Sequence, residues 1–442
     1  MHKSLRKYIL MIVLFPFFAD AQTSTSSPYS IFGLGELKMG GFTQHHGAGG
    51  TSIALRDQNN FSYSNPASYS NVKFTIYNAG AGVSFGKMSD QITEAKTNSG
   101  NFSHFAMAFP LTTKKPIAFS FGVNQYSDIG YEIKNTVSTD TPSYFNLYNG
   151  SGGINRLYVG YGIALFNNFS LGGNLNMNFG NIQSRKYRVY PNSDKVYSFS
   201  DETFYAYRGL DFDLGVQYSV QSGKKKENKI NHTLGAVIHG GSILYGDGYR
   251  YAETFYGPSF RVGGSPASID TLMYEDNKKD TMAKPLGIAL GYTINKGDKW
   301  ALSLEAEQIL FSSVENRVTS SSFQDNMRYS AGFSLIPSPN YGERGSLLKH
   351  IRYSLGLRYE DLYYNFNAQR FQEFGISFGL GLPVVKSVRL EDEKVPVVSR
   401  VNISAEYIKR GSSSNDFIQE DYFKIGLGLN LNDKWFTKRK YR

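Results

Sequence analysis

Cysteine is absent from all 442 residues. Its absence excludes structural disulfides, thiol nucleophiles, zinc–thiolate sites and a lipid-modified N-terminal cysteine. Long hydrophobic runs are also missing, because no segment after residue 18 approaches the roughly 20 apolar residues that a transmembrane helix needs. A helical membrane protein is therefore not expected, and the fold must be held by backbone pairing and burial.

Aromatic residues and glycine are abundant by contrast. Phe, Tyr and Trp make up 15% of the chain and glycine occurs 45 times, yet the mean hydropathy is only −0.36. Many rings without long apolar runs indicate segments in which apolar and polar residues alternate.

The N-terminus has the pattern of a secretory signal peptide. Basic residues precede the apolar stretch 8–18, and Ala19 and Ala21 then form an A-x-A cleavage site before Gln22. Removal of residues 1–21 takes three positive charges and one negative charge, so the net charge falls from +10 to +8. An exported basic chain meets membrane lipid before it meets nucleic acid. Outer-membrane lipids are therefore expected partners, and nucleic acid is not.

Alternation with period two is clearest in residues 210–218. Leu210, Phe212 and Leu214 share one face with Val216 and Tyr218, whereas Asp211 and Asp213 lie on the other. Such a segment separates lipid from a polar lumen in a transmembrane barrel. A soluble sandwich also alternates, so the signal peptide and the number of segments must decide between the two.

Fourteen segments show this pattern, and an even number suits a closed antiparallel barrel whose backbone groups are all paired within lipid. They lie near 72–85, 101–111, 117–129, 154–166, 169–186, 203–219, 230–245, 285–294, 300–310, 326–336, 351–364, 371–382, 399–410 and 421–431. We predict an all-β, 14-stranded antiparallel transmembrane barrel over residues 72–431 in the outer membrane, with periplasmic termini.

The connections then alternate between external loops and periplasmic turns. The longest predicted external loop is 246–284, and the tightest turn is at Asn167-Asn168. Two periplasmic links, 337–350 and 383–398, are longer than such barrels favour. They indicate either partner-binding elaborations or an error in the predicted register nearby.

Residues 22–71 have little strand pattern. A disordered leader is one interpretation, but Tyr29, Phe32, Ile53 and Phe61 are too apolar for a solvated tail. We predict that this segment folds back as a hatch that plugs the lumen, with glycines where it passes close to the wall.

The segment His46-Gly47-Ala48-Gly49-Gly50-Thr51-Ser52-Ile53-Ala54-Leu55-Arg56-Asp57, followed by Asn65-Pro66-Ala67, resembles the FadL family of outer-membrane transporters (OMPP1/FadL/TodX-like). The opening 27–35 and the ending 432–436 look like those of FadL-like barrels from Bacteroidota. The resemblance implies a hatch within a fourteen-stranded barrel and passive uptake of hydrophobic small molecules such as long-chain fatty acids. Uptake is therefore the expected function, and the alternative is a non-transporting subunit or shuttle in an outer-membrane protein secretion or assembly machine, a role that FadL-like barrels also serve.

The hatch motif Asn65, Pro66 and Ala67 is the first candidate site. Proline fixes its own φ and restricts the preceding residue, and the asparagine side chain can bond nearby backbone. The motif is therefore a stiff turn, and either a gating role or a plain turn fits it.

Charged residues at lumen-facing positions form the second candidate site. Most are expected to pair with one another in a polar lumen. A fatty-acid carboxylate would need a cation, so Arg352 and Arg358 are the candidate lumen contacts for it.

The predicted long external loop is rich in aromatic residues. Tyr249, Tyr251, Phe255, Tyr256 and Phe260 are candidates for contact with an external ligand or partner. Through the resemblance they would form a landing groove, although an aromatic girdle at the membrane interface is the favoured explanation.

No catalytic, cofactor or metal site is predicted, and the chain is not expected to be an enzyme. No serine and histidine are marked as a pair on one wall, and the adjacent His45 and His46 have no carboxylate cluster nearby. Residues 432–442 form a basic tail predicted to reach inner-leaflet phosphates or an acidic periplasmic or outer-membrane protein partner.

Overall fold

The computed structural model describes residues 27–434 apart from short gaps. These gaps are 91–92, 113–114, 139–141, 167, 194, 224–228, 263–266, 315–322, 342–345, 367–368, 391–392 and 412–416. The predicted signal peptide, the first residues of the predicted hatch and residues 435–442 of the predicted tail lie outside the described residues.

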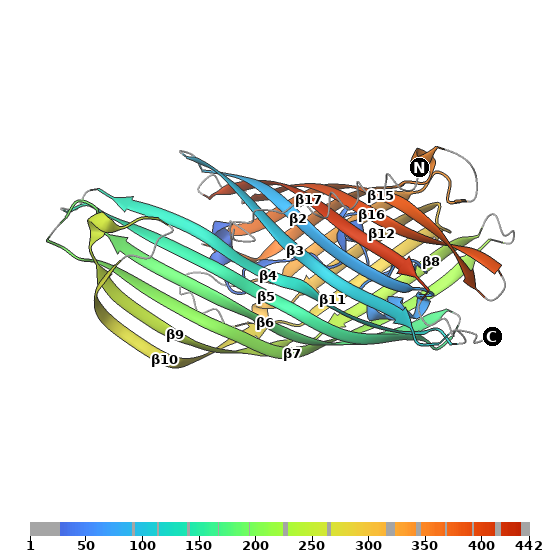
Figure 1. Cartoon of the computed structure of the whole chain (residues 1–442), viewed down its shortest axis with the longest axis horizontal. Helices are drawn as coiled ribbons and strands as arrows, with labels where there is room; N and C mark the ends of the chain where they lie inside the picture. The colour runs from blue at the N-terminus through green and yellow to red at the C-terminus, as the bar shows by residue number, and fades with distance from the viewer. Residues whose placement is uncertain are drawn as a thin grey trace, which may run out of the picture.

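The described chain forms a closed antiparallel barrel of fourteen strands, as predicted (Figure 1). The strand segments are β2 (Thr75–Ser89), β3 (Glu94–Pro110), β4 (Ile117–Val137), β5 (Tyr144–Ala164), β6 (Phe169–Val189), β7 (Ser198–Ser222), β8 (Ile230–His239), β9 (Ser242–Phe255), β10 (Ser268–Lys284), β11 (Gly287–Lys296), β12 (Trp300–Ile309), β13 (Asn326–Leu335), β14 (Arg352–Phe366), β15 (Gln369–Leu390), β16 (Glu393–Gly411) and β17 (Gln419–Asp433). Closure comes from pairing of the last strand with the first, in the register Asn430↔Asn78.

Sixteen segments make fourteen strands because two strands are interrupted. β8 pairs with residues 213–222 of β7, and β9 pairs with residues 198–208 of the same strand. β8 and β9 are therefore halves of one strand that breaks at Gly240-Gly241. β10 and β11 pair with those halves in the same way.

The alternating pattern separates lipid-facing from lumen-facing side chains. On β7, Leu210, Phe212 and Leu214 are exposed, whereas Asp211 and Asp213 are buried. Apolar side chains on the outside of a closed barrel match a bilayer, and the closed ladder leaves no open strand edge within it. No helix among the described residues is long and apolar enough to cross a membrane.

One side of the barrel is much taller than the sequence pattern predicted. The predicted external loop 246–284 is instead largely the β9–β10 hairpin, and β4 to β7 extend through the predicted loops 130–153 and 187–202 (Figure 1). The predicted link 383–398 is also largely strand, the β15–β16 hairpin. Alternation fades where strands leave the bilayer, because neither face then meets lipid, while backbone pairing continues.

The described part of the N-terminal segment, residues 27–74, packs against the inner wall and is called the plug below. It contains η1 (Pro28–Ile31), β1 (Glu36–Leu37), α2 (Thr43–His46) and η2 (Pro66–Asn71). Wall glycines make room for it: a Cβ on Gly356 would lie 1.9 Å from the nitrogen of Gly49.

The wall has a seam between β3 and β4. Residues His104–Pro110 of β3 pair with Ala118–Asn124 of β4, and the pairing of the two strands ends there. The register between β4 and β5 shifts between Gln125 and Ser127. Beyond that point β1 takes the place of β3, with Glu36 opposite Asp128. The plug therefore supplies a short additional strand where the wall separates.

Candidate functional site: the plugged lumen

The Asn65-Pro66-Ala67 turn fixes the plug to the wall. Asn65 is fully buried, accepts a hydrogen bond from the nitrogen of Ala67 (3.0 Å) and donates one to the carbonyl of Ile53 (2.7 Å). Its amide also donates to Val216 on β7 at 3.3 Å. The side chain thus caps η2 and connects two plug loops to the wall.

Pro66 lies directly against two wall glycines. A Cβ on Gly162 would approach the Pro66 carbonyl oxygen to 2.5 Å, and one on Gly172 would lie 2.2 Å from the Pro66 carbonyl carbon. Only hydrogen at these positions allows the plug backbone to approach so closely. The contact identifies the motif as an anchoring turn.

A second anchor holds the loop around Ile53. The backbone nitrogens of Ser52 and Ile53 donate to the carboxylate of Glu305 on β12. Gln217 on β7 donates to the carbonyls of Ile53 and Leu55, both at 3.0 Å. Wall side chains therefore satisfy plug backbone groups that would otherwise be buried without partners.

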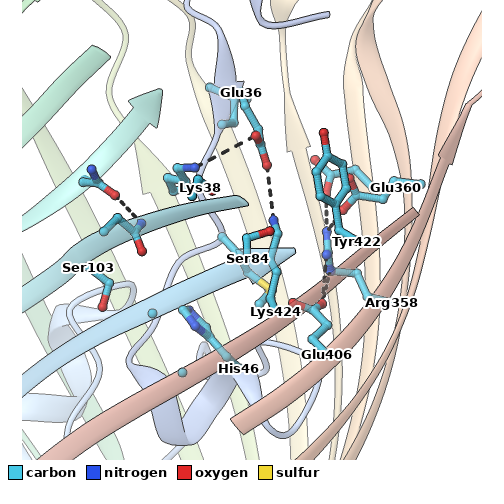
Figure 2. Close-up of a pocket in the computed structure, with 18 of the residues that line it drawn as sticks. Glu36, Lys38, His46, Ser84, Ser103, Arg358, Glu360, Glu406, Tyr422 and Lys424 are labelled. Atoms are coloured by element: carbon cyan, nitrogen blue, oxygen red, sulfur yellow. Dashed lines mark hydrogen bonds and ion pairs between the residues drawn. The ribbon is translucent and has the colours of Figure 1, made fainter. Parts of the chain in front are cut away.

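Arg358 on β14 lies at the centre of a buried ionic network in the lumen. Its guanidinium donates to Glu360 at 3.0 Å and to Glu406 at 2.9 Å (Figure 2). It also pairs with Glu373. Both Arg358 and Glu360 are at most 5% exposed. Three carboxylates from β14, β15 and β16 already surround this cation.

Arg410 on β16 extends the network to the plug. It contacts Glu373 and, at 3.2 Å, Glu420 on the wall, and it reaches Glu36 of β1 at 3.1 Å. Lys424 on β17 also contacts Glu36 at 3.2 Å, as Figure 2 shows. Because Arg410 and Glu420 are almost completely buried, neither charge has water as an alternative partner.

Two further contacts hold residues 27–38 of the plug against the wall. Lys38 pairs with Asp128 on β4 at 3.1 Å, beside the seam. The Ser27 hydroxyl donates to Glu420 at 2.7 Å. Residues 27–38 are thus tied to β4, which borders the seam, and to β16 and β17, which lie beside the β17–β2 closure of the barrel.

A separate polar cluster lies on the opposite wall. Asp211 pairs with Lys284 at 3.0 Å, and Asp213 pairs with His239 at 2.7 Å. The amide of Asn176 donates to both carboxylates, at 2.6 and 2.8 Å. Charges on this wall are therefore mutually compensated.

The structure places the two predicted lumen cations differently. Arg358 lies in the ionic network, whereas Arg352 contacts Asp57 of the plug at 3.3 Å near the other end of the lumen. The structure brings Arg358 together with Glu360, Glu373 and Glu406.

The five external aromatic residues do not form one surface. Phe255 and Phe260 are buried against Leu147, Tyr187 and Val189. Tyr249 donates to Glu202 at 2.8 Å and Tyr251 to Glu253 at 2.9 Å, while Tyr256 is exposed.

Sequence reasoning missed several members of the ionic network. Arg410, Glu420 and Lys38 were not proposed as site residues, although Arg410 pairs with three carboxylates, as many as Arg358 does. Each of the two wall residues lies at a lumen-facing position of its strand, which is the signal that marks it. Lys38 has no such signal, because the plug has no regular period.

Two cavities in the described part of the lumen are small and have charged side chains in their lining. One of about 160 Å³ is bordered by Glu36, Lys38, Arg358 and Lys424, and another of about 90 Å³ by Arg156, Lys284 and Glu305. A third, of about 580 Å³, opens at the end of the barrel with the shorter turns and is lined by polar residues. The described residues contain no group of three or more His, Asp or Glu side chains placed to hold a metal ion.

A family model described as BamG matches residues 1–442. A comparison with curated proteins gives no match.

Solved structures with a similar fold include a FadL homologue from Pseudomonas aeruginosa, with 11% identity and a TM-score of 0.56, covering 89% of this chain and 99% of that one. The toluene transporter TodX from Pseudomonas putida has 12% identity and a TM-score of 0.53, with 90% and 99% coverage. The CymD monoaromatic hydrocarbon channel has 11% identity and a TM-score of 0.53, covering 90% of this chain and 98% of that one. At such low identity these similarities establish the shared barrel fold.

Proposed function

The chain belongs to the BamG family, and we propose that it is a non-transporting barrel subunit of an outer-membrane machine that assembles or secretes other proteins. The plugged lumen carries this proposal. A hydrophobic ligand needs an apolar site of roughly 300–1,000 Å³. Two cavities among the described lumen residues measure about 160 and 90 Å³, and ionic groups lie in the lining of both.

The seam in the wall supports the same proposal. Apolar molecules that leave a barrel sideways need an opening between strands, and β3 separates from β4 beyond Asn124. That position is taken by β1, which pairs with β4 and is held by the Lys38–Asp128 ion pair. Opening it would break backbone hydrogen bonds and separate a buried ion pair, at a cost of several kcal/mol.

We further propose that the end with the short turns faces the periplasm, as outer-membrane barrels favour. The tall β4–β10 wall then projects outside the cell. Because the chain has no cysteine, single cysteines at Asp276 and Lys299 can be labelled with a membrane-impermeant maleimide in whole cells. Labelling at position 276 but not at 299 supports this orientation, and the reverse contradicts it.

Uptake of hydrophobic small molecules is the second candidate. The observation in its favour is the fold shared with a toluene transporter and a monoaromatic hydrocarbon channel. In this alternative the plug must move to create both a pocket and an exit.

The decisive experiment is purification of the tagged barrel from its native membrane in mild detergent, followed by mass spectrometry of proteins and lipids. We expect a stoichiometric protein partner and no apolar ligand in the lumen. A monomer that carries a fatty acid or hydrocarbon, and whose deletion abolishes uptake of that compound, would establish transport instead.

A further inference from the structure

The cavity at the short-turn end differs in kind from the cavities of the lumen. It measures about 580 Å³ and is lined by the plug loop 56–59 and by the β5–β6, β7–β8 and β11–β12 ends of the wall. We call it the mouth pocket. Its lining residues are Arg56, Asp57, Gln58, Asn59, Asn71, Asn168, Ser219, Gln221, Asn231, Thr233, Asn295, Gly297 and Asp298.

We propose that the mouth pocket binds an extended, acidic polypeptide segment of a periplasmic protein partner. The inference rests on the proposed function and orientation and specifies the chemistry of the partner. It is carried by the lining of the pocket, by one uncompensated cation in it and by the charge of its rim.

Side-chain amides dominate the lining. Each amide carries both a donor and an acceptor, as does each peptide unit of an extended chain. Asn71 and Asn168 make no side-chain hydrogen bond within the described part of the protein, and the bond from Gln221 to Asn231 (2.9 Å) leaves the other half of each amide available. Such a surface suits a peptide backbone and offers nothing to a hydrocarbon.

Arg56 is the uncompensated cation. Its Nη1 atom is buried and has no hydrogen-bond partner among the described residues, and no ion pair to Arg56 is present there. The neighbouring Asp57 is already engaged by Arg352 at 3.3 Å. A half-buried guanidinium without a counter-charge favours a carboxylate from outside, which it can hold with paired hydrogen bonds.

The rim adds positive charge of the same sign. Lys73, Lys229 and Lys299 are exposed and lie within two positions of the lining residues Asn71, Asn231 and Asp298 in the sequence. Asp298 is the exposed acidic residue in the lining, beside Lys299. An acidic segment is therefore attracted before it enters, and its carboxylates find Arg56 inside.

The test uses the full-length barrel in mild detergent and a fluorescein-labelled peptide of alternating aspartate and alanine. Binding is measured by fluorescence anisotropy against the asparagine–alanine peptide of equal length and a lysine–alanine peptide. We expect the aspartate peptide to bind at least tenfold more tightly than either, because charge-assisted hydrogen bonds contribute about 1.5–3 kcal/mol.

Arg56→Gln should weaken binding of the aspartate peptide roughly tenfold, whereas the matched Arg261→Gln at the opposite end of the barrel should leave it unchanged. Asn231→Leu, on the wall, should weaken both acidic and neutral peptides by a similar factor because it removes backbone contacts. This wall variant keeps the inference testable if Arg56→Gln disturbs the plug, and thermal unfolding checks that each variant is folded.

Equal affinity for the three peptides, or unchanged affinity in both Arg56→Gln and Asn231→Leu, overturns the inference. Loss of peptide binding on transfer to nanodiscs containing phosphatidylglycerol also overturns it, because the rim lysines then bind lipid. A protein partner that co-purifies without any peptide selectivity removes this inference alone. If peptide binding persists and no partner co-purifies, the proposed function fails instead.

Discussion

The contact between Gly172 and the plug provides a sharp test of how the lumen is closed. Gly172 on β6 faces the plug, and an added Cβ would lie 2.2 Å from the carbonyl carbon of Pro66 and 2.5 Å from the nitrogen of Ala67. Both neighbours are backbone atoms, so the clash cannot be relieved by a side-chain rotation. Gly172→Ala therefore requires the plug to move by about 1 Å, where van der Waals contact between such atoms is normally about 3.5 Å.

We expect Gly172→Ala to lower the free energy of unfolding by about 2–4 kcal/mol. Overpacking contributes about 1–3 kcal/mol, and weakening of a buried Asn65 hydrogen bond contributes about 1 kcal/mol. The adjacent Gly173 is a matched control, since its Cβ would meet Leu214 at an ordinary 3.5 Å. Gly173→Ala should leave the stability unchanged or raise it by about 0.5–1 kcal/mol through reduced backbone entropy in the unfolded chain.

Urea unfolding in detergent, followed by circular dichroism, measures both variants. Limited trypsin digestion then reports on the plug, because Arg56 should become cleavable in Gly172→Ala before the barrel unfolds. The reasoning is refuted if the two alanine variants have the same stability, or if Gly172→Ala is as resistant to trypsin as the unmodified protein.

Three further predictions concern the same lumen. Arg410→Met leaves buried carboxylates without their cation and should cost about 3–5 kcal/mol in urea unfolding, whereas Arg208→Met at an exposed pair should cost less than about 1 kcal/mol; equal costs would contradict the assignment of the network. Asn65→Ala should lose about 2 kcal/mol and make the plug more sensitive to trypsin, and an unchanged digestion pattern would show that the cap is dispensable. Burial lowers the pKa of His45 to about 3, so its contribution to stability is complete above about pH 6.5 and falls as the pH drops towards 3, by up to about 1.4 kcal/mol per pH unit. His45→Gln should flatten that part of the stability–pH curve, and an identical slope in both proteins would exclude His45 as its source.

Much of the barrel follows from the sequence because a bilayer imposes a local rule. A strand that separates lipid from a polar lumen must alternate, so Leu210, Asp211 and Phe212 already indicate which way each side chain points. The same rule identifies Arg358 as a lumen residue, and the structure places it in the ionic network. The absence of cysteine and of long apolar runs removed the main alternatives before any strand was assigned.

Other features depend on tertiary contacts that leave no local trace. The sequence pattern predicts a loop where the structure has the β9–β10 hairpin. Outside the bilayer a strand needs backbone hydrogen bonds to its neighbours but no lipid-facing side chains, so the alternating pattern is missing there. Lys38 pairs with Asp128, and Glu36 pairs with Arg410. In both pairs the two residues lie far apart in the sequence, so no local pattern connects them.

The sequence by itself thus determined an alternating β-chain with an apolar N-terminal segment and a stiff Asn65-Pro66 turn, and it predicts a signal peptide for export. Only the tertiary structure decided that the plug completes the wall at the β3–β4 seam, that Arg410 connects plug and wall in addition to Arg352, and that Arg56 of the mouth pocket has no ion-pair partner among the described residues. The physical reason is that alternation is set by each residue's immediate solvent, whereas the balance of buried charges depends on which distant strands closure brings together.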